Sequence, residues 1–275
     1  MPGATGTTSR SRRSAREGGE TRAAGRGSAG TKDDMIKHES ERFTLYCADA
    51  ADVLDTLEAK CVGLIATDPP YGVKWQSNFR KGSKLSKIAN DDADYDAVGV
   101  VAAYVKYALM PFRHLYVFGS TVTQAERLML GGACDLVWDK GQVGLGDLTL
   151  PWGPQHEMIL FGVYVPSKQN RDDGKGALSA RLRAGSVLRV DRPNSKAVKK
   201  HPTEKPVELM RRLIESSSSV DDVVLDMFAG SGSTLVAAIL SGRKAIGAEV
   251  AAEHYETALA RCIAAESLWR AGQDA

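Results

Sequence analysis

The amino-acid sequence predicts an α/β protein with a mostly parallel, seven-stranded sheet that is covered by helices on both faces. Short apolar runs rich in β-branched residues alternate with stretches of helical apolar spacing, the pattern of strand–helix–strand units. Two of these runs end in acids, Asp68 and Asp226, beside turn-forming residues. Because open α/β sheets bind ligands at the carboxyl ends of their strands, we expect a site at that edge.

The composition is that of a globular protein of ordinary size. The chain has 275 residues, 43% hydrophobic and 25% charged, which suits one α/β domain with a tail. It contains no run of 18 apolar residues and no apolar stretch near its start, so we expect neither a membrane span nor a secretory signal. The four cysteines are scattered, so we expect reduced core residues of a cytoplasmic protein and no metal site.

The net charge of +2 is unevenly distributed. Residues 1–34 carry seven basic and four acidic residues but almost no large apolar side chains, so we expect a disordered basic tail before a catalytic domain at 35–275. Residues 165–200 carry ten basic and three acidic residues. This segment suggests contact with a polyanion, and a solvated surface loop is the alternative.

The elements follow in order along the chain. We expect strands at 43–47, 61–67, 115–118, 135–138, 156–165, 223–226 and 244–249. We expect helices at 51–58, 95–110, 121–130, 206–216, 234–240 and 252–265, with Pro206 in the first turn of its helix. The polar stretch 72–94 is predicted to be a surface loop beside the site, and 141–154 to be irregular.

The strand at 61–67 is followed by Asp68, Pro69, Pro70 and Tyr71. Successive prolines fix the backbone and remove two N–H donors, so carbonyls there can accept from another group. An acid, such a carbonyl and a flat ring together suit an amino group attached to a flat base. The alternative is a strand that ends in a simple Pro-Pro turn.

The stretch from Leu225 to Thr234 predicts a strand, a glycine-rich loop and a helix start. Its glycines, Gly230 and Gly232, allow close approach of backbone to a ligand. The loop lacks both the three-glycine dinucleotide fingerprint and the Gly-Lys-Ser/Thr ending of phosphate loops, which disfavours NAD and ATP. Glu249 ends the next strand, where an acid can accept from ribose hydroxyls. A purely structural turn is the alternative.

Together these motifs closely resemble the amino-methyltransferases of DNA that use S-adenosylmethionine (AdoMet). The catalytic motif precedes the cofactor motif, which resembles the circularly permuted β-class. His201–Leu209 resembles the family segment before the cofactor strand, and Cys47-Ala48-Asp49 resembles the end of its opening strand, with Ala48 in place of the usual glycine. The resemblance spans about residues 42–265 and implies a Rossmann-like methyltransferase fold.

The resemblance also implies roles for individual residues. Asp68 and the Pro69 carbonyl would accept the amine N–H groups, with Pro70 completing the motif and Tyr71 stacking on a flipped base. The residues assigned to AdoMet are Asp49, Lys205, Asp226, Phe228, Gly230, Gly232, Thr234 and Glu249. Glu249 would hold the ribose, Asp49 the adenine edge and Lys205 the methionine carboxylate. The alternatives are a helix N-cap for Asp49 and a solvated helix start for Lys205.

The implied function is site-specific methylation of double-stranded DNA, with N6 of adenine favoured over N4 of cytosine because Asp68 opens the motif. Cytosine-N4 enzymes more often carry serine there, and enzymes that modify RNA or protein amides more often carry asparagine. A catalytically silent nucleic-acid-binding module and a nicotinamide oxidoreductase are rivals from other classes. Residues 165–200 would be a short target-recognition insert. We expect a monomer or homodimer in the cytoplasm of a bacterial or phage-infected cell, and a restriction endonuclease partner stays open.

Overall fold

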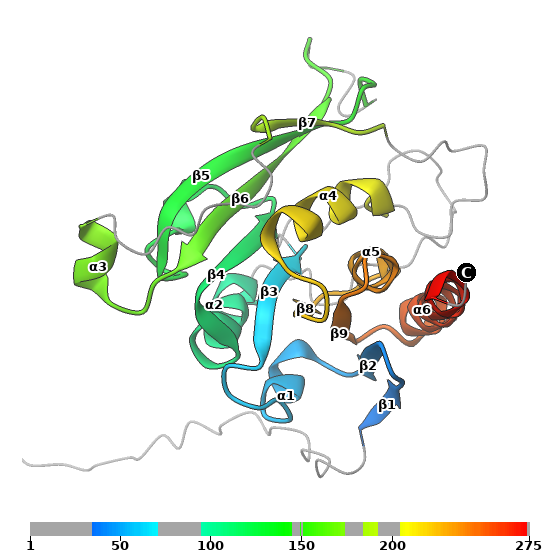
Figure 1. Ribbon diagram of the computed structural model, residues 1–275. Coiled ribbons are helices and arrows are strands. Elements are labelled where there is room, and N and C mark those ends of the chain that lie inside the picture. Colours follow the sequence, from blue (N-terminus) through cyan, green and yellow to red (C-terminus); the bar gives the residue numbers. More distant parts are fainter. Residues whose placement is uncertain are drawn as a thin grey trace, which may run out of the picture.

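The computed structural model describes residues 35–70, 95–144, 149, 151–173, 184–191 and 204–273. These residues form one nine-stranded sheet with helices on both faces (Figure 1). The predicted tail, the loop at 72–94 and the catalytic-motif residue Tyr71 lie outside the described residues. The described residues of the site lie at the strand ends and around the helices next to them.

The sheet contains all of the predicted strand positions and two additional strands. The strands are β1 (Ile36–Glu39), β2 (Phe43–Cys47), β3 (Val62–Thr67), β4 (Leu109–Phe118), β5 (Leu130–Asp139), β6 (His156–Tyr164), β7 (Val187–Arg189), β8 (Val223–Asp226) and β9 (Lys244–Glu249). The helices are α1 (Ala50–Leu54), α2 (Ala97–Tyr107), α3 (Lys168–Asp172), α4 (Val207–Ser217), α5 (Ser233–Leu240) and α6 (Ala252–Gln273), with a short 3₁₀ helix, η2 (Val122–Gln124).

The strand order brings the two predicted motifs together at one edge. The order is β1-β2-β9-β8-β3-β4-β6-β5-β7. Strands β2, β9, β8, β3 and β4 are parallel neighbours, whereas β6 runs antiparallel to both β4 and β5. The carboxyl ends of β3 and β8 therefore lie next to each other, and the start of β6 reaches the same edge. Ligands bind at such an edge in open α/β sheets.

Two apolar layers sandwich the sheet. Along β3, Leu64 and Ala66 pack into the layer that also holds residues of α4, α5 and α6, whereas Ile65 packs into the layer that holds residues of α1 and α2. Every residue of β3 is buried, as expected for a parallel strand covered on both faces. Figure 1 shows α4 and α5 on one side of β3 and α2 on the other. This packing fixes the position of Asp68 at the end of β3.

The prediction of seven strands was wrong, because the sheet has nine. The additional strands, β1 and β7, are short and lie at the two edges of the sheet. Neither carries a run of apolar residues long enough to be recognised as a strand in the sequence, since an edge strand needs little burial. The mostly parallel α/β architecture itself is confirmed.

The predicted helix at 121–130 was also wrong. Only η2 is helical there, and Leu130 already begins β5, which pairs with β6 along most of its length. The apolar spacing suits a helix, but pairing with β6 overrides this local preference. The helix α3 was not predicted, because its segment carries no apolar periodicity. Further differences concern element ends: β4 starts at Leu109, and α6 continues to Gln273.

In the described part of the chain, no helix has the length and apolar character needed to cross a bilayer. The same part holds no cluster of three or more His, Cys, Asp or Glu side chains that could bind a metal ion. All four cysteines are free, but Cys134 is exposed, which corrects the expectation that the cysteines lie in the core. Its strand, β5, is next to the edge strand β7.

Candidate active site

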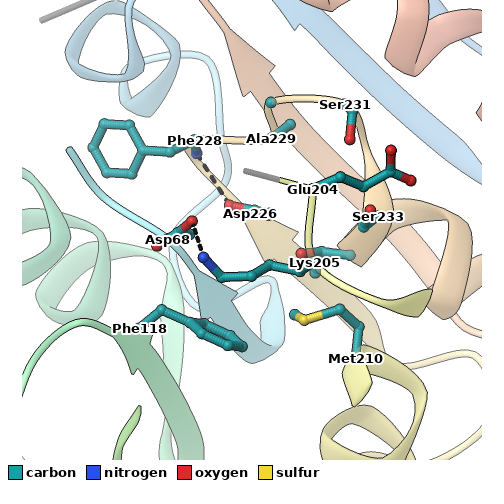
Figure 2. A pocket seen from close by; sticks show the side chains of 12 residues that line it. Asp68, Phe118, Glu204, Lys205, Met210, Asp226, Phe228, Ala229, Ser231 and Ser233 are labelled. Atoms are coloured by element: carbon teal, nitrogen blue, oxygen red, sulfur yellow. Dashed lines mark hydrogen bonds and ion pairs between the residues drawn. The ribbon is translucent and has the colours of Figure 1, made fainter. Parts of the chain in front are cut away.

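A cavity opens where β3 and β8 end. Its lining combines the acid that follows β3, the glycine-rich loop that follows β8, and the residues around the start of α4. The lining residues are Asp68, Phe118, Glu204, Lys205, Met210, Asp226, Phe228, Ala229, Gly230, Ser231, Ser233 and Thr234. Figure 2 shows the side chains of Asp68, Lys205 and Asp226 facing one another across this cavity. The fold thus brings Asp68, from the first predicted motif, next to the glycine-rich loop, which is the second.

Asp226 is the most deeply buried acid of the cavity, with 3% of its surface exposed. Its Oδ1 accepts hydrogen bonds from Thr67 Oγ1 at 2.8 Å and from the Phe228 N–H at 3.1 Å. Burial raises the pKa of Asp226 to about 6, and the nearby charge of Asp68 adds to this, while hydrogen bonds from Thr234, Thr67 and Phe228 oppose it. A buried carboxylate of this kind suits a cationic ligand.

The glycine-rich loop has a backbone that only glycine adopts easily. Gly230 and Gly232 have φ values of +53° and +81°, in the region that side chains disfavour. A Cβ on Gly232 would lie 3.0 Å from the Ala258 Cβ of α6, whereas a Cβ on Gly230 would meet no heavy atom within 4 Å. The loop therefore packs tightly against α6 at Gly232 and leaves open space beside Gly230.

Glu249, at the end of β9, holds this loop from the side. Its Oε2 accepts a hydrogen bond from the Gly230 N–H at 2.8 Å, and its Oε1 accepts from the Ala251 N–H at 2.8 Å. His254 Nδ1 lies 3.8 Å from Oε1. A hydrogen bond to Glu249 raises the pKa of His254, although burial opposes this. Glu249 does not itself line the cavity. Its contact with the site is the hydrogen bond from Gly230, which does line the cavity.

Lys205, which the resemblance assigns to a cofactor carboxylate, contacts two carboxylates of the chain itself. Its Nζ lies 2.5 Å from Asp68 Oδ2 and 2.9 Å from Glu157 Oε1, and 5.0 Å from the centre of the Phe118 ring. Burial lowers the pKa of Lys205, but the two carboxylates outweigh it and the net shift is upward. The alternative of a solvated lysine is wrong, because only 12% of the side chain is exposed.

Asp49 lies outside the cavity lining. It follows β2 and is the N-cap of α1, where Oδ1 accepts a hydrogen bond from the Ala51 N–H at 2.8 Å. The structural role considered as an alternative is therefore present. Because Cys47 pairs in register with Glu249, Asp49 and Glu249 still share one edge of the sheet.

Pro69 and Pro70 line a second cavity, on the side of β4 and α2. The remaining residues of its lining are Tyr95, Asp96, Ala97, Val98, Gly119, Ser120, Thr121, Thr123 and Gln124. Asp68 lines the first cavity and its two successors line the second. The segment 68–70 thus lies between two hollows at the same sheet edge.

Several residues of the site carried no recognised signal in the sequence. Glu157 of β6 pairs with Lys205, and Lys140, which follows β5, pairs with Glu157. Both contacts depend on the order of the strands in the sheet. Arg261 of α6 binds the Ser231 carbonyl through Nη1 at 2.6 Å and Glu204 through Nη2 at 2.7 Å. In the sequence, Arg261 cannot be told from a solvated basic residue of a helix. The position of Glu204 next to Lys205 was the one sign that Glu204 lies at the site.

The chain is similar to known DNA methyltransferases over most of its length. The profile of the DNA methylase family matches residues 62–260. Type II methyltransferase M2.MboI of Moraxella bovis is 46% identical over 247 residues, which cover 80% of this chain and 88% of that protein. DNA adenine methyltransferase YhdJ of Escherichia coli (strain K12) is 28% identical over 252 residues, which cover 81% and 83% of the two chains.

A solved structure supports the fold. The crystal structure of the M1.HpyAVI–SAM complex superimposes with a TM-score of 0.57 at 21% identity, covering 80% of this chain and 98% of that chain. At this identity the likeness concerns the Rossmann-like methyltransferase fold, which is thereby confirmed. The family match spans both the strand that ends at Asp68 and the strand that ends at Asp226. The chain therefore belongs to the DNA methylase family of N6- and N4-specific methyltransferases.

Proposed function

We propose that this chain transfers a methyl group from AdoMet to the exocyclic amine of a base flipped out of double-stranded DNA, with N6 of adenine as the favoured target. One observation carries the proposal: Asp68 and the glycine-rich loop line the same cavity. The adenine-specific name of the Escherichia coli relative supports the choice of base. The order of the two motifs along the chain supports a circularly permuted, β-class arrangement.

The lining of the cavity fits AdoMet, which carries a sulfonium and an ammonium group. Three acids line this space, Asp68, Glu204 and Asp226, together with one cation, Lys205. The surplus of acids attracts a cationic ligand. The open space beside Gly230 leaves room for a ligand against the loop. The residues proposed to hold AdoMet are Asp226, Phe228, Gly230, Gly232, Thr234 and Glu249, with Asp49 at the adenine edge.

Bound AdoMet supplies an electrophilic methyl group. The chain has to present the amine in line with that group and to exclude water. The Asp68 carboxylate and the Pro69 carbonyl are proposed to accept the amine N–H groups, which turns the lone pair of the nitrogen toward the methyl. Phe118 and Met210 supply apolar lining near the Asp68 carboxylate. No covalent intermediate with the chain is required.

The second cavity is proposed to receive the flipped base. Pro69 and Pro70 form one wall, and Ser120, Thr121 and Gln124 offer polar groups to the base edge. Tyr71 is proposed to stack on the base. Segment 165–200 is proposed to contact the DNA backbone, with Arg189 largely exposed on β7. Because this segment is short, we expect either a short target sequence or a second subunit that takes part in recognition. The proposed location of the reaction is the cytoplasm.

A nucleoside assay tests the proposal. The chain is incubated with methyl-labelled AdoMet and either unmodified plasmid or, in a parallel reaction, RNA, and the nucleic acid is digested to nucleosides. We expect label in N6-methyladenine. Label in N4-methylcytosine alone would overturn the choice of base, and label in RNA but never in DNA would overturn the substrate class. Binding of AdoMet and DNA without any transfer would favour a silent binding module.

A further inference from the structure

Four charged side chains form a continuous, partly buried series of ion pairs beside the cavity. Asp68 Oδ2 lies 2.5 Å from Lys205 Nζ, Glu157 Oε1 lies 2.9 Å from the same nitrogen, and Glu157 Oε2 lies 3.0 Å from Lys140 Nζ. The exposed fractions of the lysine side chains are only 12% for Lys205 and 8% for Lys140. In Figure 2, Lys205 extends beneath Asp226 with its ammonium directed at Asp68.

The four residues come from four different elements. Asp68 follows β3, Lys205 precedes α4, Glu157 belongs to β6, and Lys140 follows β5. Their charges alternate in sign and sum to zero. Buried charges are costly unless they are paired, so removing one member leaves its neighbour uncompensated. The carboxylates of Asp68 and Glu157 therefore fix the position of the Lys205 ammonium from two sides.

The pKa directions agree with this geometry. Burial raises the pKa of Glu157, but Lys205 and Lys140 outweigh it and hold that pKa below its ordinary value. The pKa of Lys205 is raised by Asp68 and Glu157 against the effect of burial. Both partners are therefore charged at neutral pH. The charge of Asp68 also contributes to the raised pKa of Asp226, which lines the same cavity.

We propose that Lys205 is a positioning residue for Asp68, and that Glu157, backed by Lys140, holds Lys205 in place. The inference rests on the proposed methyl transfer and assigns Lys205 to the reacting carboxylate instead of to a cofactor carboxylate. An ammonium fixed against Oδ2 locks the Asp68 side chain in one orientation. The carboxylate then presents its oxygens as hydrogen-bond acceptors for the amine from one fixed position.

A split between kcat and cofactor affinity separates the two roles of Lys205. For Lys205→Met we expect kcat on plasmid DNA to fall about 100-fold, the scale seen when a reacting group is misplaced by about 1 Å. The AdoMet Kd, measured by calorimetry, should change less than about 3-fold. Lys205→Arg, which keeps the charge, should recover part of kcat. A Kd raised more than about 10-fold with kcat intact at saturation would overturn the proposal.

Substitutions at Glu157 and Lys140 distinguish a positioning role from a purely structural one. For Glu157→Gln we expect kcat to fall about 10-fold with the AdoMet Kd unchanged. Adding Lys140→Met to Glu157→Gln should lower kcat little further, because Lys140 acts through Glu157. If Glu157→Gln lowers the melting temperature but leaves kcat at the wild-type value, Glu157 is only a brace and its proposed role is refuted.

Glu208→Gln provides the matched control. Glu208 pairs with Arg211 and Arg212 on the solvent side of α4, where all three side chains are about half exposed. This variant also removes one carboxylate charge near Lys205 in sequence, and we expect its kcat to equal that of the wild type. If the wild-type chain methylates no DNA, the proposed function falls; if it does and Lys205→Met retains full kcat, only the positioning role falls.

Discussion

Thr67 Oγ1 donates a hydrogen bond of 2.8 Å to Oδ1 of Asp226, and this bond links the strand of the catalytic motif to the strand of the cofactor loop. Thr67 is fully buried and immediately precedes Asp68. Burial raises the pKa of Asp226 to about 6, so its charge changes just below neutral pH. The proposed cofactor site is thus joined to the strand that carries Asp68 through a carboxylate with a raised pKa.

The first prediction concerns AdoMet affinity as a function of pH. Asp226 is ionised above its pKa of about 6 and protonated below it. Because a cationic ligand binds the ionised form better, the AdoMet Kd should be lowest near about pH 7, above the pKa of Asp226 and below about pH 8, where the α-amino group of AdoMet loses its proton. It should rise by up to about tenfold per pH unit below about pH 6, as one linked proton requires. Calorimetric titration over this range measures it.

Two variants serve as controls for this titration. Asp226→Asn should bind AdoMet weakly and without the acidic rise in Kd. Thr67→Val keeps the shape but removes a hydrogen bond that lowers the pKa of Asp226, so the rise should begin at a higher pH. An identical pH profile in all three proteins would show that Asp226 does not govern binding.

The second prediction concerns Asp68. In Asp68→Asn the side chain keeps its size but presents an amide, which weakens the acceptor for the amine N–H groups and leaves Lys205 facing Glu157 alone. We expect methyl transfer to fall at least about 100-fold while AdoMet still binds. Single-turnover transfer and calorimetry measure the two quantities separately. Near-normal turnover would contradict the proposed role of this acid.

The third prediction concerns the domain division. Residues 35–70 already contain the first strands of the sheet, and β1 begins at Ile36. We propose that residues 35–275 form the catalytic domain, so deletion of residues 1–34 should change kcat less than about 3-fold at low salt. A large loss of kcat, measured with the same plasmid assay, would show that the tail takes part in transfer.

The sequence was enough to predict the strands that carry the site. The strands ending at Asp68, Asp226 and Glu249 are short apolar runs bounded by acid, proline or glycine, and each has the predicted position. In contrast, Leu130 was assigned to a helix because its neighbours also fit a helical period. Pairing between β5 and β6 decided the outcome, and such long-range pairing leaves no local signal.

The partners of Lys205 show the same limit within the site. Its position before α4 could be inferred, but its contact with Asp68 and Glu157 depends on β6 lying beside β4. Strand order is a property of the whole sheet and is not encoded in any one segment. A charged residue such as Glu157 at a strand start therefore looks solvated until the neighbouring strand is known.

The fourth prediction tests the tight packing of the glycine-rich loop. An alanine at Gly232 would need φ near +81° and would place its Cβ 3.0 Å from the Ala258 Cβ and 3.1 Å from the Ala258 Cα. The helix backbone cannot move away easily, so we expect Gly232→Ala to lower the free energy of unfolding by about 1–3 kcal/mol or more. Urea denaturation measures it, with AdoMet affinity falling in parallel.

Gly272→Ala is the control for that change. Gly272 lies near the end of α6, where an added Cβ would meet nothing within 4 Å. Alanine favours a helix over glycine by up to about 1 kcal/mol, so this variant should be as stable as the wild type or slightly more stable. Equal stability of the two variants would refute the proposed contact with Ala258.

The last prediction concerns Glu249 and the ribose of the cofactor. Both carboxylate oxygens already accept backbone N–H groups, from Gly230 and from Ala251. In Glu249→Gln one acceptor is replaced by an amide NH₂, which faces one of those donors and can no longer accept from a ribose hydroxyl. We expect the affinity for S-adenosylhomocysteine to fall by about 1–3 kcal/mol, the cost of an unpaired buried donor.

Loss of the loop contact and loss of a ribose contact can be separated with a second ligand. An S-adenosylhomocysteine analogue that lacks both ribose hydroxyls should bind the wild-type chain more weakly but bind Glu249→Gln with little additional penalty. The coupling energy between the substitution and the hydroxyls then measures the contact directly. If the two penalties simply add, Glu249 acts only by holding the Gly230 N–H, and the ribose has to be bound by other residues.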